Sequence, residues 1–233
     1  MTEADSRVPF PERSALDHVD SAARTLVSFI PGVGAPAAQL LNLVIAPPLE
    51  QRRRDWFDGL ADRLDRLERK VEGITFESLR DEEAFITAAT TASMIAIRNH
   101  DKEKLAALQN AVVNVALCTE PDLELQAVFL SLVDYLTPLH MRLLRFFEHP
   151  RAFVAHSRRD TAGARTTREI ALRVLQDLPP EAYDLLCRDL ENRGLVQLPI
   201  EPTIGLTDER PTELGKRFLR FISGEQAGGT GQS

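Results

Sequence analysis

The sequence has few of the residues that build disulfide frameworks and metal sites, with two cysteines and five histidines among 233 residues. Cys118 and Cys187 are far apart, and neither lies at zinc-ligand spacing from a histidine, which predicts buried, reduced thiols. The histidines form no His-Glu-x-x-His motif. A nucleophile, a general base and an orienting group cannot be named together, so we expect no metal, no cofactor and no enzymatic activity.

Positive charge is also scarce. The chain has 28 lysines and arginines against 35 acidic residues, for a formal net charge of −7. A protein that coats nucleic acid has a basic surface, so this balance excludes that class.

The sequence starts with acidic and polar residues and not with a basic segment followed by an apolar one. We therefore expect a cytoplasmic location, with membrane association as the alternative.

The spacing of apolar residues is mostly helical, which predicts a mainly α fold. We expect a flexible arm at 1–13, a helical domain at 14–136, a second domain at 137–223 and a flexible tail at 224–233. The expected elements are helices at 14–30, 37–46, 49–72, 81–98, 101–117, 123–136, 138–148, 167–175, 181–192 and from Thr212 onward, with strands at 195–198 and 203–206 paired as one β-hairpin.

Local signals add detail to these helices. The prolines Pro47 and Pro48 are expected to end the short helix before them. The helices at 81–98 and 101–117 are joined by so few residues that they should form an antiparallel hairpin. Helical periodicity places Ile86, Met94 and Val128 among the inward-facing residues.

Residues 49–72 have apolar side chains at alternating steps of three and four, the spacing of one stripe along a helix. The stripe extends just past this helix and consists of Phe57, Leu60, Leu64, Leu67, Val71 and Ile74. Acid-to-base pairs at i,i+4, such as Asp62 with Arg66, indicate that the other faces lie in solvent. A stripe this narrow suits one partner helix. Packing within the chain is favoured, and a homodimer is the alternative.

An uncharged run extends from Leu26 to Leu49 and is long enough to cross a bilayer. Prolines and glycines in it would leave backbone groups unsatisfied in lipid, which argues against a straight span. We favour a buried helical hairpin, with membrane contact as the alternative. Arg52-Arg53-Arg54 beside a tryptophan is typical of an interfacial anchor. The residues that would contact a membrane or a partner are Phe29, Ile30, Val33, Leu41, Val44 and Trp56.

Three short segments in the last third of the chain resemble those of a known domain family. They are Thr137-Pro138-Leu139-His140, Leu190-Glu191-Asn192-Arg193-Gly194-Leu195-Val196 and Thr212-Glu213-Leu214-Gly215-Lys216-Arg217-Phe218. With the expected order of helices and hairpin, residues 137–223 resemble the winged helix-turn-helix domain of MarR-like transcription regulators. The resemblance implies a winged-helix-like domain whose helix at 181–192 binds DNA. Residues 14–136 resemble only helical segments of uncharacterised bacterial proteins, which imply no function.

The charges of the expected recognition helix argue against DNA as its partner. Residues 181–193 carry four acids and two arginines, which would repel phosphates. A local basic patch is the alternative, formed by Arg158, Arg159, Arg165, Arg168, Arg173, Lys216, Arg217 and Arg220. We therefore expect a regulatory or adaptor protein that binds a protein or DNA partner. The alternative is a membrane-directed helical effector with a sequestered apolar hairpin at about 26–49.

Overall fold

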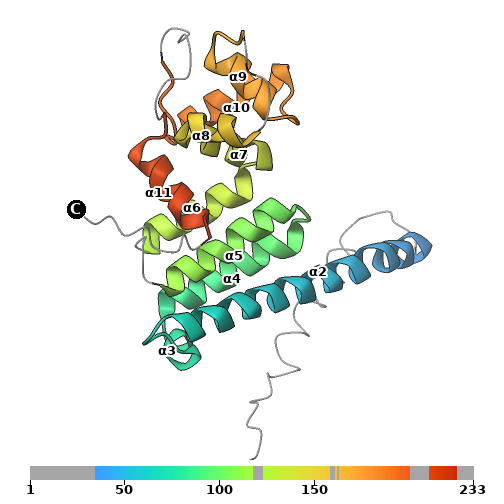
Figure 1. Cartoon of the computed structure of the whole chain (residues 1–233). Helices are drawn as coiled ribbons and strands as arrows, with labels where there is room; N and C mark the ends of the chain where they lie inside the picture. Colours follow the sequence, from blue (N-terminus) through green and yellow to red (C-terminus); the bar gives the residue numbers. More distant parts are fainter. Residues whose placement is uncertain (1–34, 118–122, 158–160, 162, 200–209, 225–233) are drawn as a thin grey trace, which may run out of the picture. The chain divides into compact units, whose positions relative to one another are not determined.

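The computed structural model describes residues 35–117, 123–157, 161, 163–199 and 210–224, and along the first helix it describes side chains from residue 48 onward. These ranges contain ten α-helices and one isolated β-bridge, which confirms the mainly α prediction (Figure 1). The predicted arm, the predicted helix at 14–30 and all but the first residue of the predicted tail lie outside them. The chain divides into two units, residues 1–55 and residues 56–233.

Helix α2 (Ala35–Lys70) begins in the first unit and ends in the second. The prediction that Pro47 and Pro48 end a short helix is wrong, because α2 continues through both. Proline removes a backbone donor, but its fixed φ of about −65° is helical. Two prolines therefore take hydrogen bonds out of the helix, but their backbone φ is compatible with its continuation.

The end of α2 follows the sequence closely. Gly73 has a φ of 90°, a left-handed conformation that glycine adopts without strain and that terminates helices. A capping box at Thr75 then starts the short helix α3 (Phe76–Arg80). This helix was not predicted, because five residues are too few to show a helical period.

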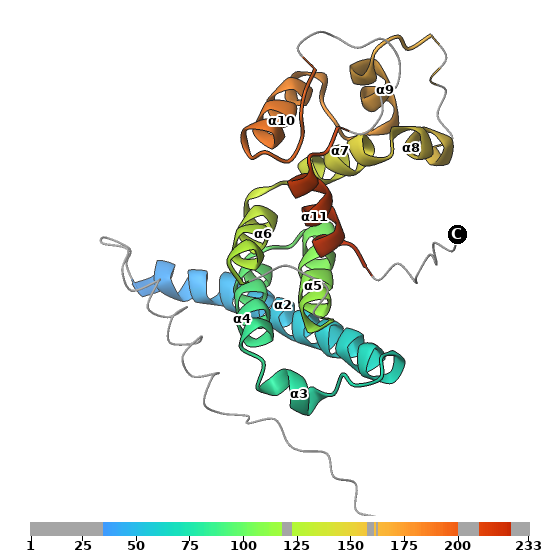
Figure 2. The ribbon, with the colours of Figure 1, turned by 90° about the vertical axis from the view of Figure 1, so that its left-hand side faces the viewer.

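Helices α4 (Glu83–Arg98) and α5 (Lys102–Ala116) form the expected antiparallel hairpin, and α6 (Leu123–Tyr135) packs beside them (Figure 2). Asp101 caps α5, since its side chain accepts from the backbone N–H groups of Glu103 and Lys104. The hairpin packs closely because both helices turn alanines inward, among them Ala92 and Ala111.

Three residues predicted to face inward lie on the surface. Ile86 is 47% exposed, Met94 is 60% exposed and Val128 is 48% exposed. On α4 the buried positions are Ala88, Ala92, Ile95 and Ala96. The buried face of α4 is therefore built mostly of alanine, and Ile86 and Met94 fall outside it at 100° per residue.

The last third contains α7 (Pro138–Glu148), α8 (Pro150–Ser157), α9 (Thr167–Val174), α10 (Pro180–Asn192) and α11 (Glu213–Ile222). Thr137, Thr166 and Thr212 cap α7, α9 and α11, each with a side-chain oxygen that accepts from a backbone N–H three residues on. The helix α8 was not predicted in this polar, arginine-rich stretch.

A large apolar core runs through the second unit. The ring of Phe129 on α6 lies 5.6 Å from that of Phe218 and 5.4 Å from that of Phe221, both on α11. Helix α11 also packs on α5. The boundary predicted at 136/137 therefore does not coincide with a break in the core, because α11 packs against helices from before it.

Candidate partner-binding site

Helices α9 and α10 are held together around one arginine. The guanidinium of Arg168 donates to the Pro180 carbonyl at 2.9 Å and lies 5.6 Å from the centre of the Tyr183 ring. Its Nε lies 3.7 Å from the Asp184 carboxylate. Arg168 was predicted as a nucleic-acid contact, and the structure places it in the joint between these two helices.

The exposed face of α10 carries one large apolar side chain, Leu185, among charged side chains. Leu185 is 69% exposed, the largest exposed fraction among the large apolar residues that the structure describes. The residues at helical spacing around it, Glu181, Asp184 and Arg188, are exposed as well. The exposure of Leu185 could have been predicted from the sequence by helical spacing. Leu185 lies on the side of the helix opposite to the inward positions Tyr183, Leu186, Cys187 and Leu190.

The second arginine of the expected recognition helix turns toward its own chain. The guanidinium carbon of Arg193 lies 3.3 Å from the centre of the Tyr135 ring, and its Nε lies 3.5 Å from the Asp189 carboxylate. A guanidinium stacked on an aromatic face is stabilised where it stands. On the face of α10 that the structure describes as exposed, Arg188 is then the one basic side chain.

The segment after α10 pairs with the residues just before α11. Gly194, with a φ of 69°, ends the helix. The next residues form an antiparallel bridge between Val196 and Pro211, flanked by a bond from the Gln197 N–H to the Arg210 carbonyl at 2.9 Å. The second predicted strand, 203–206, lies outside the described residues.

The remaining predicted DNA contacts lie just before α9, on α9, on α11 and beyond the described ranges. Arg165 and Arg173 are exposed, Lys216 and Arg217 are half-buried, and Arg220 is exposed with its guanidinium 3.4 Å from Glu213 on the same helix. Arg158 and Arg159 lie outside the described residues. The contacts of Arg168 and Arg220 are therefore with their own protein's acidic groups.

A buried histidine joins α7 to α10. His140 Nδ1 accepts from the Thr137 N–H at 3.2 Å, and Nε2 lies 3.2 Å from Asp189. Burial lowers the pKa of His140, and the positive charges of Arg193 and Lys104 act in the same direction, although Asp189 raises it. Protonation of Nδ1 would also remove the lone pair that accepts from the Thr137 N–H, and with it one bond of the α7 cap. Elsewhere on α10, burial raises the pKa of the Cys187 thiol to about 11, as expected for an inert thiol.

The predicted membrane contacts are only partly described. Phe29, Ile30 and Val33 lie outside the described residues, and Leu41 and Val44 lie on α2 where side chains are not described. Trp56 is placed differently from the prediction, because it is 2% exposed and its indole N–H donates to Ser93 Oγ at 2.9 Å. A tryptophan buried against α4 is unavailable as an interfacial anchor.

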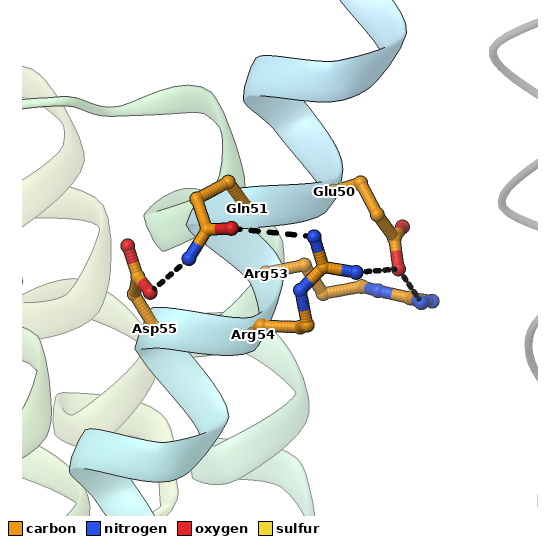
Figure 3. A network of polar contacts seen from close by, with 5 residues as sticks. All are labelled: Glu50, Gln51, Arg53, Arg54 and Asp55. Carbon is orange, nitrogen blue, oxygen red and sulfur yellow. Dashed lines mark hydrogen bonds and ion pairs between the residues drawn. The ribbon is translucent and has the colours of Figure 1, made fainter.

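Two of the three arginines before Trp56, Arg53 and Arg54, contact neighbouring side chains of the same helix (Figure 3). Arg53 donates to Glu50 at 2.7 Å, and Arg54 contacts the same carboxylate at 3.4 Å. Gln51 links Arg54 to Asp55 by accepting from the guanidinium at 3.2 Å and donating to the carboxylate at 2.6 Å. The acidic groups offset part of the positive charge that the lipid-anchor hypothesis requires.

The apolar stripe on α2 packs mostly against its own chain. Leu60 and Leu67 are buried, whereas Phe57 is 49% exposed. Leu64, Val71 and Ile74 are half-buried against the core formed by Leu67, Leu79 and Ala116. The predicted ion pair of Asp62 with Arg66 is replaced by a bond from Arg66 Nε to the Asp62 carbonyl. The stripe thus has a partner surface within the chain.

No single helix of the described residues is long and apolar enough to cross a membrane, and one bent pair, α6 with α7 at 116°, meets the criterion by length and composition alone. In comparisons with family models, curated proteins and solved structures, no match to this chain was found.

Proposed function

We propose that this protein is a non-enzymatic regulatory or adaptor protein that binds a protein partner through a winged-helix-like segment at 137–223. The order α7, α9, α10, the bridge between Val196 and Pro211, and α11 supports the winged-helix resemblance. The observation that carries the choice of partner is the exposed face of α10, where Leu185 is 69% exposed.

The chemistry of that face favours protein over DNA. Glu181 and Asp184 beside Leu185 place negative charge where a DNA-reading helix needs donors for phosphates and base edges. An exposed leucine ringed by charges has the form of an interface centre with a polar rim. The partner that fits has an apolar pocket with basic residues around it.

The test compares the wild-type chain with Leu185→Ser and with a matched control. Leu123→Ser makes the same change at a leucine on α6 that is 50% exposed. Affinity capture from the native cell, quantified by mass spectrometry, should recover a partner with the wild type and with Leu123→Ser, and lose it with Leu185→Ser. Recovery of the same proteins by all three baits would contradict the proposal.

A parallel measurement decides between protein and DNA. Fluorescence anisotropy with duplex DNA should give weak binding that does not depend on Arg173 or Lys216. Tight binding that falls steeply with salt and weakens in Arg173→Gln would assign the winged-helix-like segment to DNA instead.

A further inference from the structure

A cavity of about 200 Å³ lies between α2, α5 and the end of α11. Three cationic side chains of α2 line it, Arg63, Arg66 and Lys70, whose spacing places them on one face of the helix. Asn110 and Asn114 of α5 add amide groups. None of the described residues that line it carries a carboxylate. The cavity is smaller than the roughly 300–1,000 Å³ of pockets for drug-sized ligands, so its size suits a small anion.

The cations are not needed to cap α11, which ends at the cavity. The last carbonyls of a helix lack partners within the helix. Here Asn110 Nδ2 donates to the Ile222 carbonyl at 3.0 Å, and Asn114 Nδ2 donates to the Phe221 carbonyl at 2.8 Å. The amides of α5 therefore satisfy the end of α11.

The two arginines also lack a carboxylate partner. Arg63 Nη1 donates to Asn110 Oδ1, which holds its guanidinium at the cavity wall. Arg66 Nε donates to the backbone carbonyl of Asp62 at 2.9 Å. Within the ranges that the structure describes, neither arginine forms an ion pair. Burial lowers the pKa of Arg63, and the positive charge of Arg66 acts in the same direction.

We propose that this cavity binds a phosphate group through Arg63, Arg66 and Lys70. Three positive charges around one small cavity match a dianion better than a single carboxylate. The planar fork of a guanidinium also fits pairs of phosphate oxygens. The phosphate can be inorganic phosphate or the phosphate of a small monoester, and the site is independent of the exposed face of α10.

The test is isothermal titration of the full chain with inorganic phosphate, at constant ionic strength kept with chloride. Arg66→Gln and Lys70→Gln should each weaken binding about tenfold or more, because each removes a charge-assisted contact. Arg69→Gln is the matched control, since it removes the same charge from an exposed position of α2 that does not line the cavity. This control should bind phosphate as the wild type does.

Two results would overturn the proposal. One is no binding by the wild type at phosphate concentrations up to about 10 mM. The other is equal weakening by Arg69→Gln and Arg66→Gln, which would indicate general charge attraction. Titration with O-phosphoserine identifies the source, because tighter binding than inorganic phosphate assigns the site to a monoester, and weaker binding assigns it to free phosphate.

Discussion

Gly215 lies in the first turn of α11, directly under the chain that follows α10. A Cβ atom built on Gly215 would stand 2.0 Å from the carbonyl oxygen of Leu195 and 3.0 Å from its carbonyl carbon. The same oxygen accepts from the Thr212 N–H at 3.0 Å. Gly215→Ala therefore cannot be accommodated by rotating a side chain, because the group in the way is backbone.

The loss of unfolding free energy in Gly215→Ala depends on how far α11 and the backbone at Leu195 must move apart. Even close carbon-to-oxygen contacts lie at about 3.3–3.6 Å, so the two segments must move apart by more than an ångström. Overpacking of this kind costs about 1–3 kcal/mol, and losing the Thr212 bond adds about 1 kcal/mol. The helix propensity of alanine returns up to about 1 kcal/mol. We expect Gly215→Ala to lower the free energy of unfolding by about 2 kcal/mol and the Tm by roughly 4–8 °C.

Gly59→Ala is the matched control, because it makes the same change inside another helix. There the Cβ would meet Gln109 Nε2 at 2.5 Å, the far end of a flexible side chain that can move away. Its stability should equal or exceed that of the wild type. Urea denaturation followed by circular dichroism measures both. A loss below about 1 kcal/mol for Gly215→Ala, or equal losses for the two variants, would refute the reasoning.

Two further predictions concern His140 and Leu64. Because the pKa of His140 is lowered in the folded chain, its contribution to stability is present above its unfolded pKa of about 6.5 and is lost as the pH falls. His140→Gln should therefore flatten the decline in unfolding free energy between about pH 7 and 5.5, measured by urea denaturation, and unchanged slopes would contradict this. Leu64→Asp should lower the Tm of a chain that light scattering finds monomeric, since Leu64 packs on its own core. Conversion of a dimer to a folded monomer would instead make the stripe an interface.

The ends of many helices could be predicted from the sequence because their causes are local. Thr137, Thr166 and Thr212 each accept from a backbone N–H three residues away, and Gly73 and Gly194 adopt the left-handed conformation that terminates a helix. Each signal acts within about one turn of chain, so it is visible in a short stretch of sequence. The bounds of α10 were predicted from the same kind of local signal, at 181–192, and the structure places the helix at Pro180–Asn192.

The faces of the helices were decided by tertiary packing. Trp56 and Phe57 are neighbours in sequence, yet Trp56 is 2% exposed and Phe57 is 49% exposed. Periodicity shows that one face is apolar, but the partner helix determines which residues at its edge are covered. The clearest case is the end of α11, whose carbonyls accept from Asn110 and Asn114, more than 100 residues earlier. No local pattern marks such a contact, because only folding brings α5 and α11 together.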